Sequence, residues 1–292
     1  MPELPEAETI VRGVRPAVTG RAIRLAHVLH ADVLRTSPRA FRRAVRGAHI
    51  VGVARRGKNV ILELHGGSVI AVNLGMTGRV LPFPTPPRGR NRPTHPAVRF
   101  YLDDGSVVVF DDQRRFGTVE HLTAPAWRER SGAMGPEPLA EGFTPELLHQ
   151  ALAPSRAPMR SWLLDQKRIA GVGNIYAAEA LFLSGIHPRR EARSVSGPEA
   201  RRLHEAIRAV LTQAIDSGGT TIRDYRNADG GEGRFARRLQ VYGRDGEPCL
   251  VCGTPVERLV FSNRSAFLCP RCQPASGGPA APRRGLPRGS RR

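Results

Sequence analysis

The sequence predicts an α+β protein in which an antiparallel β-sandwich precedes a helical region and a cysteine-rich segment. Between residues 22 and 121, short runs of β-branched and aromatic residues alternate with tight turn signals, which is typical of a sandwich. From residue 144 to about 216, apolar residues recur at helical spacing. With 292 residues, the chain is long enough for two domains.

The first predicted element is a helix over residues 4–19. Pro5 suits a first helical turn, and Gly20 can end the helix. One apolar stripe runs along it, formed by Ala7, Ile10, Val11 and Val14. We expect the positive end of this helix to lie beside the N-terminal amine, so that Pro2 is anchored and its amine is less readily protonated.

The sandwich strands are predicted from runs that turn signals separate. They are residues 24–29, 50–56, 60–64, 68–74, 98–102 and 106–110. Residues 82–96 form a long loop rich in proline and arginine. The helical region is predicted to contain helices that begin near Thr144 and Ser196, with two more over residues 159–165 and 175–183.

Charge favours a polyanionic partner. The formal net charge is +19 and aromatic residues make up 5% of the chain. Nucleic acid is the first candidate and an acidic membrane surface the second. No apolar run approaches the length of a membrane span and no signal-peptide pattern is present, so we expect a cytoplasmic protein in contact with nucleic acid.

The basic residues are unequal, because Lys58 and Lys167 are the only lysines among 45 basic residues. Arginine binds phosphate through a planar fork, whereas lysine offers a compact and tunable amine. For either lysine, solvated surface charge is the ordinary interpretation.

The cysteines predict a metal site. Cys249, Cys252, Cys269 and Cys272 form two Cys-x2-Cys pairs separated by sixteen residues. This spacing fits one tetrahedral Zn²⁺ held by four thiolates, with no open position, so the zinc is predicted to be structural. The zinc would hold a short hairpin over residues 255–267, which carries Arg258 and Arg264. Each of these arginines suits either a phosphate contact or a solvated rim.

Two further features, a Gly-x-Gly-Asn turn and the N-terminal proline, indicate a function only when they are considered together with the other motifs. Residues 168–174 join two helical patterns through a Gly-x-Gly-Asn turn, which can bind an anion or serve as a plain helix–helix turn. Removal of Met1 would make Pro2 the first residue. An α-amine has a reference pKa of about 8, so part of it is neutral and able to form a Schiff base with a sugar aldehyde carbon. The alternative is a frayed chain end.

Together these motifs resemble those of the formamidopyrimidine-DNA glycosylase family, which is close to endonuclease VIII. The resemblance covers residues 1–273. It is carried by Pro-Glu-Leu-Pro-Glu at 2–6, Asn-Leu-Gly-Met-Thr-Gly at 73–78, Arg-Arg-Phe-Gly at 114–117, Leu-Asp-Gln at 164–166, Gly-Val-Gly-Asn-Ile-Tyr-Ala at 171–177, Thr-Thr-Ile-Arg-Asp-Tyr at 220–225, Val-Tyr-Gly-Arg at 241–244 and the four cysteines.

The resemblance implies a division of the chain. It is an N-terminal catalytic β-sandwich domain (1–124), a linker (125–143), a helix–two-turns–helix domain with a lesion loop (144–235), a zinc finger (236–273) and a disordered basic tail (274–292).

The resemblance also implies roles for residues. Pro2 is the nucleophile that attacks C1′ of the lesion sugar, and Glu3 is its acid/base partner. Lys58 holds a phosphate near the lesion, while Asn174 and Arg264 clamp the phosphates around the flipped nucleotide.

Further roles concern the space that the flipped nucleotide leaves. Met76 and Phe116 wedge into it and Arg114 faces the widowed base, although core packing is the ordinary interpretation of the first two. Glu6 is a supporting carboxylate or an ordinary first-turn residue. The lesion loop spans residues 220–235, and its candidate residues are Thr220, Thr221, Arg223 and Tyr225.

Several positions depart from the family pattern. They are Gln113 for proline, Asn263 for glycine, Arg226 for an apolar residue, and Arg156 and Arg160 for lysines. None removes a chemical group that the reaction needs, but Asn263 and Arg226 bear on lesion preference and loop closure.

The predicted function is therefore a monomeric, nucleoid-associated DNA glycosylase with AP-lyase activity. It would excise oxidised purines, namely 8-oxoguanine and formamidopyrimidines, from double-stranded DNA, nick the strand by β,δ-elimination, and need one structural zinc. The alternatives are an endonuclease VIII-like enzyme for oxidised pyrimidines and a noncatalytic zinc-bearing DNA-binding protein.

Overall fold

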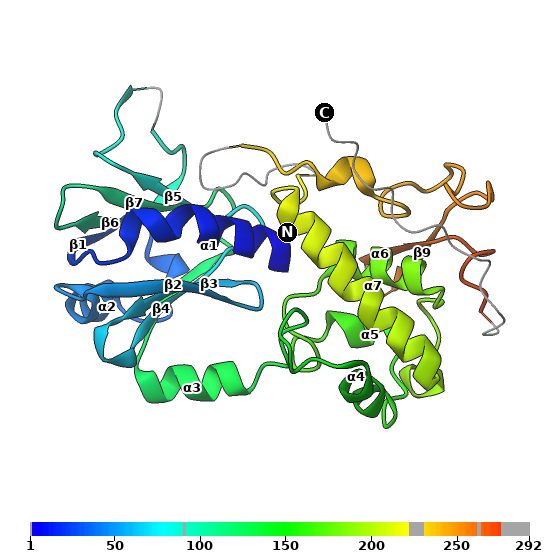
Figure 1. The fold of residues 1–292 in the computed structure, drawn as a ribbon. Helices are drawn as coiled ribbons and strands as arrows, with labels where there is room; N and C mark the ends of the chain where they lie inside the picture. The colour runs from blue at the N-terminus through cyan, green and yellow to red at the C-terminus, as the bar shows by residue number, and fades with distance from the viewer. Residues whose placement is uncertain (1, 90–91, 222–230, 262–263, 276–292) are drawn as a thin grey trace. The chain divides into compact units, whose positions relative to one another are not determined.

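The computed structural model describes residues 2–89, 92–221, 231–261 and 264–275 (Figure 1). The chain forms two compact units. The first contains residues 1–137 and 212–237, and the second contains residues 138–211 and 238–292. The predicted basic tail lies outside the described residues from position 276 onward.

The first unit contains two four-stranded antiparallel sheets, which confirms the predicted β-sandwich (Figure 1). One sheet has the order β1-β6-β7-β5, with strands Ile23–Val28, Pro96–Leu102, Val107–Asp111 and Arg79–Phe83. The other has the order β2-β3-β4-β8, with strands Ile50–Arg56, Asn59–Leu64, Val69–Asn73 and Thr118–Leu122.

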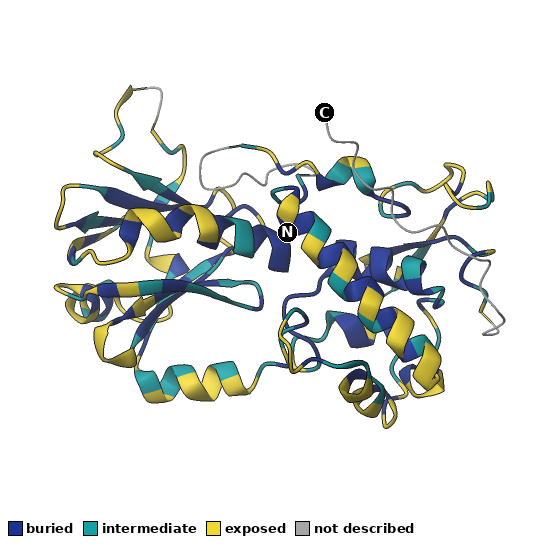
Figure 2. Cartoon of the chain, in the orientation of Figure 1, coloured by how far each residue is buried: buried dark blue, intermediate teal, exposed yellow. Residues whose placement is uncertain are grey.

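Helix α1 (Leu4–Val18) lies against strands of both sheets, contacting β2 and β3 of one sheet and β5 of the other (Figure 1). Its apolar stripe is fully buried, as the spacing of Ile10, Val11 and Val14 predicts (Figure 2). The same core takes in Phe41 of helix α2 (Pro38–Val45) and Phe100 of β6. The N-terminus of α1 is thereby attached to the main core of the unit.

Two strands and two α-helices in the described part of the first unit are absent from the sequence predictions. Strand β5 contains Pro82, a residue that argues against a strand interior, but β5 lies at the edge of its sheet, where proline is tolerated. Strand β8 is also an edge strand, and α2 is short. Helix α3 (Ala124–Gly132) begins one residue before the predicted linker and takes up its first part, with Pro125 in the first helical turn.

The second unit contains the predicted helices. They are α4 (Pro145–Leu152), α5 (Met159–Leu164), α6 (Asn174–Ser184) and α7 (Gly197–Asp216), whose last residues belong to the first unit. The side chain of Thr144 caps α4 by accepting a hydrogen bond from Leu147 N. One face of α7 is buried and includes Leu203, Ile207 and Val210. Among the described residues, no helix has the length and hydropathy that a membrane span requires.

The cysteine segment forms a hairpin of β9 (Glu257–Phe261) and β10 (Arg264–Leu268). Its buried face packs on Ala178 and Phe182 of α6. Glu179 of the same helix is buried, and its carboxylate accepts hydrogen bonds of 2.8–3.0 Å from the backbone N–H groups of residues 240–242. Burial raises the pKa of Glu179, and these three bonds oppose that rise. Short 3-10 helices complete the fold at Ala31–Val33, His65–Gly67, Ala192–Ser194 and Phe235–Arg238.

Candidate functional site

The N-terminus of α1 is buried and held by a carboxylate. Pro2 is buried, and Glu3 and Glu6 are 3% and 1% exposed. One oxygen of Glu6 accepts a hydrogen bond from Glu3 N at 2.8 Å. The other accepts one from Thr220 N at 2.7 Å, more than 200 residues along the chain. Glu6 therefore joins the first residues of the protein to the start of the predicted lesion loop.

The two ends of the predicted lesion loop are held together by backbone contacts. Thr220 forms a β-bridge with Arg234, and Gly233 N donates to the Thr221 hydroxyl at 2.8 Å. A Cβ on Gly233 would lie 2.3 Å from the carbonyl oxygen of Gly219, so only glycine fits this crossing. Four other residues of interest, Arg223, Tyr225, Arg226 and Asn263, lie outside the described residues.

Lys58 lies in the turn between β2 and β3, and this turn is fastened by Glu137. The carboxylate of Glu137 accepts from Gly57 N at 2.7 Å and pairs with Arg56 at 3.0 Å and Arg55 at 2.5 Å. The side chains of Arg55 and Glu137 are 10% and 20% exposed, so the pair is shielded more than a surface ion pair. The backbone on which Lys58 stands is therefore fixed.

A row of amide hydrogen bonds runs from the Lys58 turn to the turn that carries Met76. Asn59 Nδ2 donates to Arg56 O at 3.0 Å, and Asn73 Nδ2 donates to Asn59 Oδ1 at 3.0 Å. Asn73 Oδ1 then accepts from Gly75 N at 3.0 Å. The two turns are consequently positioned by one network within the first unit.

The turns that carry Met76 and Phe116 are packed against each other. A Cβ on Gly75, whose φ is +57°, would lie 2.4 Å from Gly117 N. Thr77 Oγ1 donates to buried Asp112 at 2.5 Å and accepts from Arg114 N at 3.0 Å. The second oxygen of Asp112 accepts from Gly117 N at 2.8 Å. Thr77 and Asp112 thus fix both turns from beneath.

The side chains on these turns point away from the core. Met76 is 38% exposed and Phe116 is 58% exposed, so neither is a core residue. The Arg114 guanidinium lies over the Phe116 ring, 4.6 Å from its centroid. Between them, Arg115 adopts a left-handed φ of +53° and pairs with Asp32 at 3.2 Å. The first unit therefore presents two exposed apolar side chains and a guanidinium on two adjacent, braced turns.

In the second unit, Asn174 is the first residue of α6 and follows the Gly-x-Gly turn. Gly171 has a φ of +84°. The Gln166 side chain organises the turn by donating to Val172 O at 2.9 Å and accepting from Gly171 N at 2.8 Å. Asn174 Nδ2 donates to Ser265 O at 3.0 Å, next to exposed Arg264 on β10. The structure therefore brings Asn174 and the Arg264 strand together.

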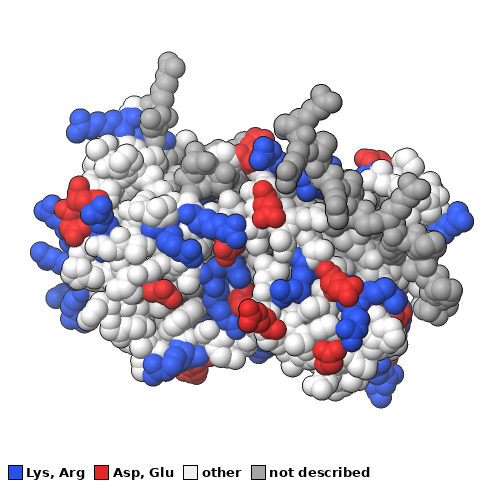
Figure 3. Space-filling view, viewed as in Figure 1, with Lys and Arg blue, Asp and Glu red and all other residues white. Residues whose placement is uncertain are grey.

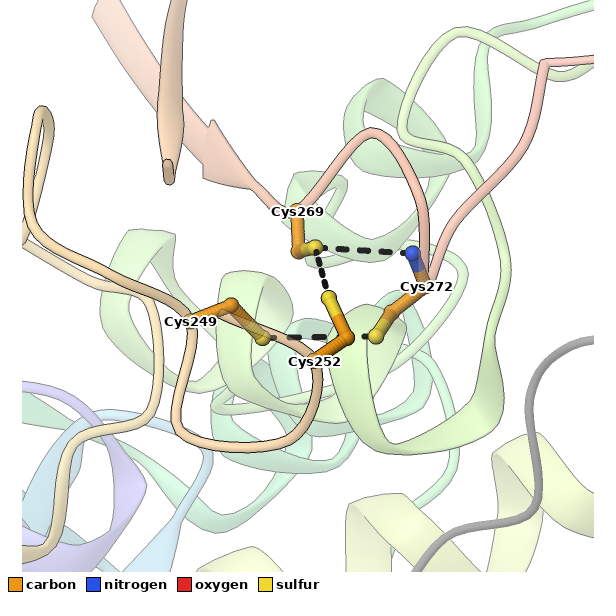
Figure 4. Close-up of side chains that lie close together, drawn as sticks. All are labelled: Cys249, Cys252, Cys269 and Cys272. Carbon is orange, nitrogen blue, oxygen red and sulfur yellow. Dashed lines mark hydrogen bonds between the residues drawn. The ribbon is translucent and has the colours of Figure 1, made fainter. Parts of the chain in front are cut away.

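The four cysteines converge on one point, two from the loop before β9 and two from the loop after β10 (Figure 4). Their Sγ atoms all lie within 4.8 Å of one another, and the Cys252–Cys269 and Cys249–Cys272 pairs are 3.4 and 4.0 Å apart. A tetrahedral zinc with Zn–S bonds of about 2.3 Å needs sulfurs about 3.8 Å apart, so this donor set fits one Zn²⁺. Burial raises the pKa of Cys269 to about 11. Metal binding must therefore displace its proton.

Basic side chains are spread over the face drawn in Figure 3, with acidic side chains among them. Several of the acids are held in ion pairs, as Glu137 is with Arg55 and Arg56. The formal net charge of +19 suits a polyanionic partner.

The predicted site residues thus form two groups. The first unit holds Pro2, Glu3, Glu6, Lys58, Met76, Arg114, Phe116, Thr220 and Thr221, and the second holds Asn174, Arg264 and the cysteines. The sequence prediction missed the residues that support them, namely Asn59, Asn73, Thr77, Asp112, Glu137, Gln166 and Arg160. Asn73, Thr77 and Gln166 stand inside the motifs, and Arg160 departs from the family pattern in residue type. Those were the signals that could have marked them.

Comparison with known proteins identifies three successive domains in this chain. Three family models match the chain. The formamidopyrimidine-DNA glycosylase N-terminal domain matches residues 1–119, and the H2TH domain of the same enzymes matches residues 134–226. The zinc finger found in FPG and IleRS matches residues 246–275.

Relatives match over nearly the whole chain. A formamidopyrimidine-DNA glycosylase of Sodalis glossinidius is 43% identical, covering 94% of this chain and 100% of the relative. Another from Symbiobacterium thermophilum is 42% identical over 98% of this chain and 94% of the relative.

Solved structures also match. The crystal structure of MutM (Fpg) from Thermus thermophilus has a TM-score of 0.83 and 40% identity over 95% of this chain and all of that chain. Lactococcus lactis Fpg bound to DNA with an abasic site has a TM-score of 0.85 and 31% identity, over 93% of this chain and 99% of that one.

Proposed function

Because this chain belongs to the formamidopyrimidine-DNA glycosylase family, we propose that its amino-terminal residues carry out the reaction and that the turns and the finger hold the DNA. The protein is a DNA glycosylase of base excision repair, and AP-lyase activity is typical of its family. Relatives in solved structures bind DNA that contains an abasic site or a modified Fapy-dG. The single observation that carries the proposal is the placement of Pro2, Glu3 and Glu6 at a buried helix start joined to Thr220.

Pro2 is the proposed nucleophile once Met1 has been removed. Its amine attacks C1′ of the damaged nucleotide, the glycosidic bond breaks, and the base leaves with a proton. The nitrogen and C1′ then form a Schiff base, from which successive β- and δ-eliminations release the two phosphates. Hydrolysis of the Schiff base frees the amine. Helix α1 begins at Leu4, so its positive end lies close to this amine.

Glu3 is the proposed acid/base partner, which donates a proton to the sugar as its ring opens. It lies beside Pro2 in the chain and is 3% exposed, so it is shielded from bulk water. Glu6 is a positioning carboxylate in this scheme, because both of its oxygens accept backbone N–H groups. This arrangement favours the supporting role over that of an ordinary first-turn residue.

Met76, Arg114 and Phe116 are proposed to fill the space that an extruded nucleotide leaves in the duplex. Their exposure supports this role, because an apolar side chain that is not needed in the core is available to stack between bases. The bracing by Thr77 and Asp112 holds the turns, so that little conformational entropy is lost on insertion.

Lys58, Asn174 and Arg264 are the proposed phosphate contacts. Lys58 stands on a fixed turn, Asn174 stands at a helix N-terminus, and Arg264 is exposed on the finger hairpin. One structural zinc held by the four cysteines fixes that hairpin. Thr220, Thr221, Arg223 and Tyr225 are proposed to belong to the loop that closes over the lesion.

We propose that the chain is divided as the resemblance implies, into a catalytic β-sandwich domain (1–124), a linker (125–143), a helix–two-turns–helix domain with the lesion loop (144–235), a zinc finger (236–273) and a basic tail (274–292). The preferred substrates are oxidised purines in double-stranded DNA. The enzyme acts as a monomer in the cytoplasm, associated with the nucleoid through its DNA substrate.

Excision from matched duplexes tests this function. One duplex carries 8-oxoguanine, one a formamidopyrimidine, one thymine glycol and one no lesion. We expect base release and strand nicking to be fastest with the two purine lesions. Faster release of thymine glycol would favour a pyrimidine enzyme, and binding without release from any duplex would identify a noncatalytic DNA-binding protein.

A further inference from the structure

Arg160 is a buried arginine in the second unit that the proposed reaction leaves without a role. It lies on α5 and is 5% exposed. Charged side chains are rarely buried unless they are paired or hydrogen-bonded, because their desolvation is costly. No carboxylate among the described residues pairs with Arg160. Its charge therefore calls for another explanation.

The guanidinium completes a closed set of three hydrogen bonds. Arg160 Nη2 donates to Asn174 Oδ1 at 2.7 Å and to Ser265 O at 3.2 Å. Asn174 Nδ2 donates to the same Ser265 carbonyl at 3.0 Å. The Asn174 amide is thereby fixed in one orientation, and it keeps one N–H that these bonds do not use.

Arg160 also holds the finger hairpin through an aromatic ring. Its guanidinium lies 5.2 Å from the centroid of Phe261, and Arg189 lies 5.4 Å from the same centroid. Phe261 is the residue that pairs with Arg264 across the hairpin. One buried side chain therefore contacts both the helix that begins at Asn174 and the strands that carry Arg264.

The positive charges of Arg160 and Arg264 are not fully compensated by the protein groups around them. Within the described part of the chain, Arg160 Nε is buried without a hydrogen-bond partner. Burial, and then the nearby charge of Arg264, lower the pKa of Arg160. An anion beside Asn174 and Arg264 would relieve this repulsion, which is what a DNA phosphate supplies.

We propose that Arg160 is a positioning residue that orients the Asn174 amide and fastens the Arg264 hairpin, so that both present their donors to one segment of DNA backbone. This proposal rests on the phosphate contacts assigned above to Asn174 and Arg264. It assigns to Arg160 an action through Asn174 rather than an independent attraction for DNA.

The choice of arginine rather than lysine at position 160 indicates which substitutions can test the proposal. Arginine stands here where lysine is typical of the family. Since Nη2 alone makes both hydrogen bonds, a lysine ammonium offers enough donors to make the same two. Lysine lacks the planar group that lies over Phe261. Arg160→Lys is therefore the conservative variant, and Arg160→Gln is the disruptive one.

A double-mutant cycle tests the action through Asn174. The variants are Arg160→Gln, Asn174→Ala and the two combined, with exposed Arg156→Lys as the control. Affinity is measured on a duplex with a tetrahydrofuran abasic analogue, which cannot be cleaved. We expect Arg160→Gln and Asn174→Ala each to weaken binding about tenfold, and the combination to be within about threefold of Asn174→Ala alone. Arg160→Lys should stay within about threefold of the parent.

Zinc content and thermal unfolding of each variant separate positioning from misfolding. If Arg160→Gln loses zinc, Arg160→Met replaces it in the cycle, because methionine also removes the hydrogen bonds to Asn174 and Ser265 but fills the buried space with an apolar side chain. Losses that multiply in the combined variant, or an Asn174→Ala variant that binds like the parent, would overturn the proposal. The proposed function is tested separately, since a parent that binds the analogue but releases no base fails there and leaves this cycle interpretable.

Discussion

The two units position their proposed DNA-contacting residues by different means. In the first unit, the α1 terminus and three turns are braced by side chains that accept backbone N–H groups, such as Glu6, Asn73 and Asp112. These braces stand on a large shared core. In the second unit, Arg264 stands on a two-stranded hairpin whose small core includes cysteine side chains. In the first unit, the positions of the proposed DNA-contacting residues depend on packing against the core. In the finger, the position of Arg264 depends on the bound metal.

The two units are therefore sensitive to different changes. A two-stranded hairpin is marginal in water on its own, so the finger needs its zinc to hold a strand against α6. The α1 terminus needs no metal, because burial of Leu4, Ala7 and Ile10 already fixes it. Chemistry should therefore fail through changes at the first site, and DNA affinity should fail through changes at the second.

The largest expected effect is that of Pro2→Gly on base release. Glycine keeps an α-amine but loses the ring that fixes the nitrogen, and we expect release to slow about a thousandfold or more. Affinity for the abasic-analogue duplex should stay within a few-fold of the parent. Single-turnover excision and equilibrium binding on the same preparation measure the two quantities. Release at the parent rate would mean that the nucleophile is misassigned.

Zinc removal should give the opposite pattern. Chelation, or Cys269→Ser, is expected to reduce DNA affinity by about a hundredfold or more because the Arg264 hairpin loses its support. Unfolding of the first unit, followed by the near-ultraviolet signal of its aromatic residues, should change little. Readdition of zinc to the chelated parent is the control. Unfolding of both units together on zinc removal would show that the first unit also depends on the metal.

Arg264→Ala removes a single proposed phosphate contact from the finger and leaves the zinc site in place. We expect affinity to fall about tenfold and the salt dependence of binding to flatten by about one phosphate contact. Arg271→Ala, an exposed arginine on the same finger, is the matched control and should affect affinity little. An unchanged salt slope in the Arg264 variant would remove its role as a phosphate contact.

Glu6→Gln replaces a carboxylate with an amide of the same shape, and we expect the smallest effect from this substitution. The amide keeps one acceptor oxygen but turns an NH2 group toward Glu3 N or Thr220 N, so one buried donor loses its acceptor. We expect unfolding to become easier by about 1–3 kcal/mol and excision to slow more than abasic-site binding weakens. Exposed Glu129→Gln on α3 is the control and should be neutral. Denaturant unfolding and excision rates check both statements.

The sequence predicted well those features that local pattern expresses. The α1 stripe, most strands, the helices of the second unit and the cysteine spacing all appear as expected. Strand β5 escaped because Pro82 is allowed at a sheet edge, and edge position follows from the sheet order rather than from the local sequence.

The supporting residues of the site could not be predicted in the same way. Thr77 meets Asp112 across 35 positions, Gly57 meets Glu137 across 80, and Glu6 meets Thr220 across 214. Such pairs leave no periodic signal, and a single polar residue in a motif does not reveal its partner. Arg160 was noticed as a departure in residue type, but its contacts with Asn174 and Ser265 emerge only in the fold.

The central claim is that the Pro2 amine becomes joined to the DNA. Borohydride reduction during reaction with an abasic or 8-oxoguanine duplex would trap a Schiff base, and digestion with mass spectrometry would locate it. We expect one adduct on the N-terminal peptide, at Pro2, in protein that has lost Met1. An adduct on Lys58, or full activity in protein that retains Met1, would contradict it.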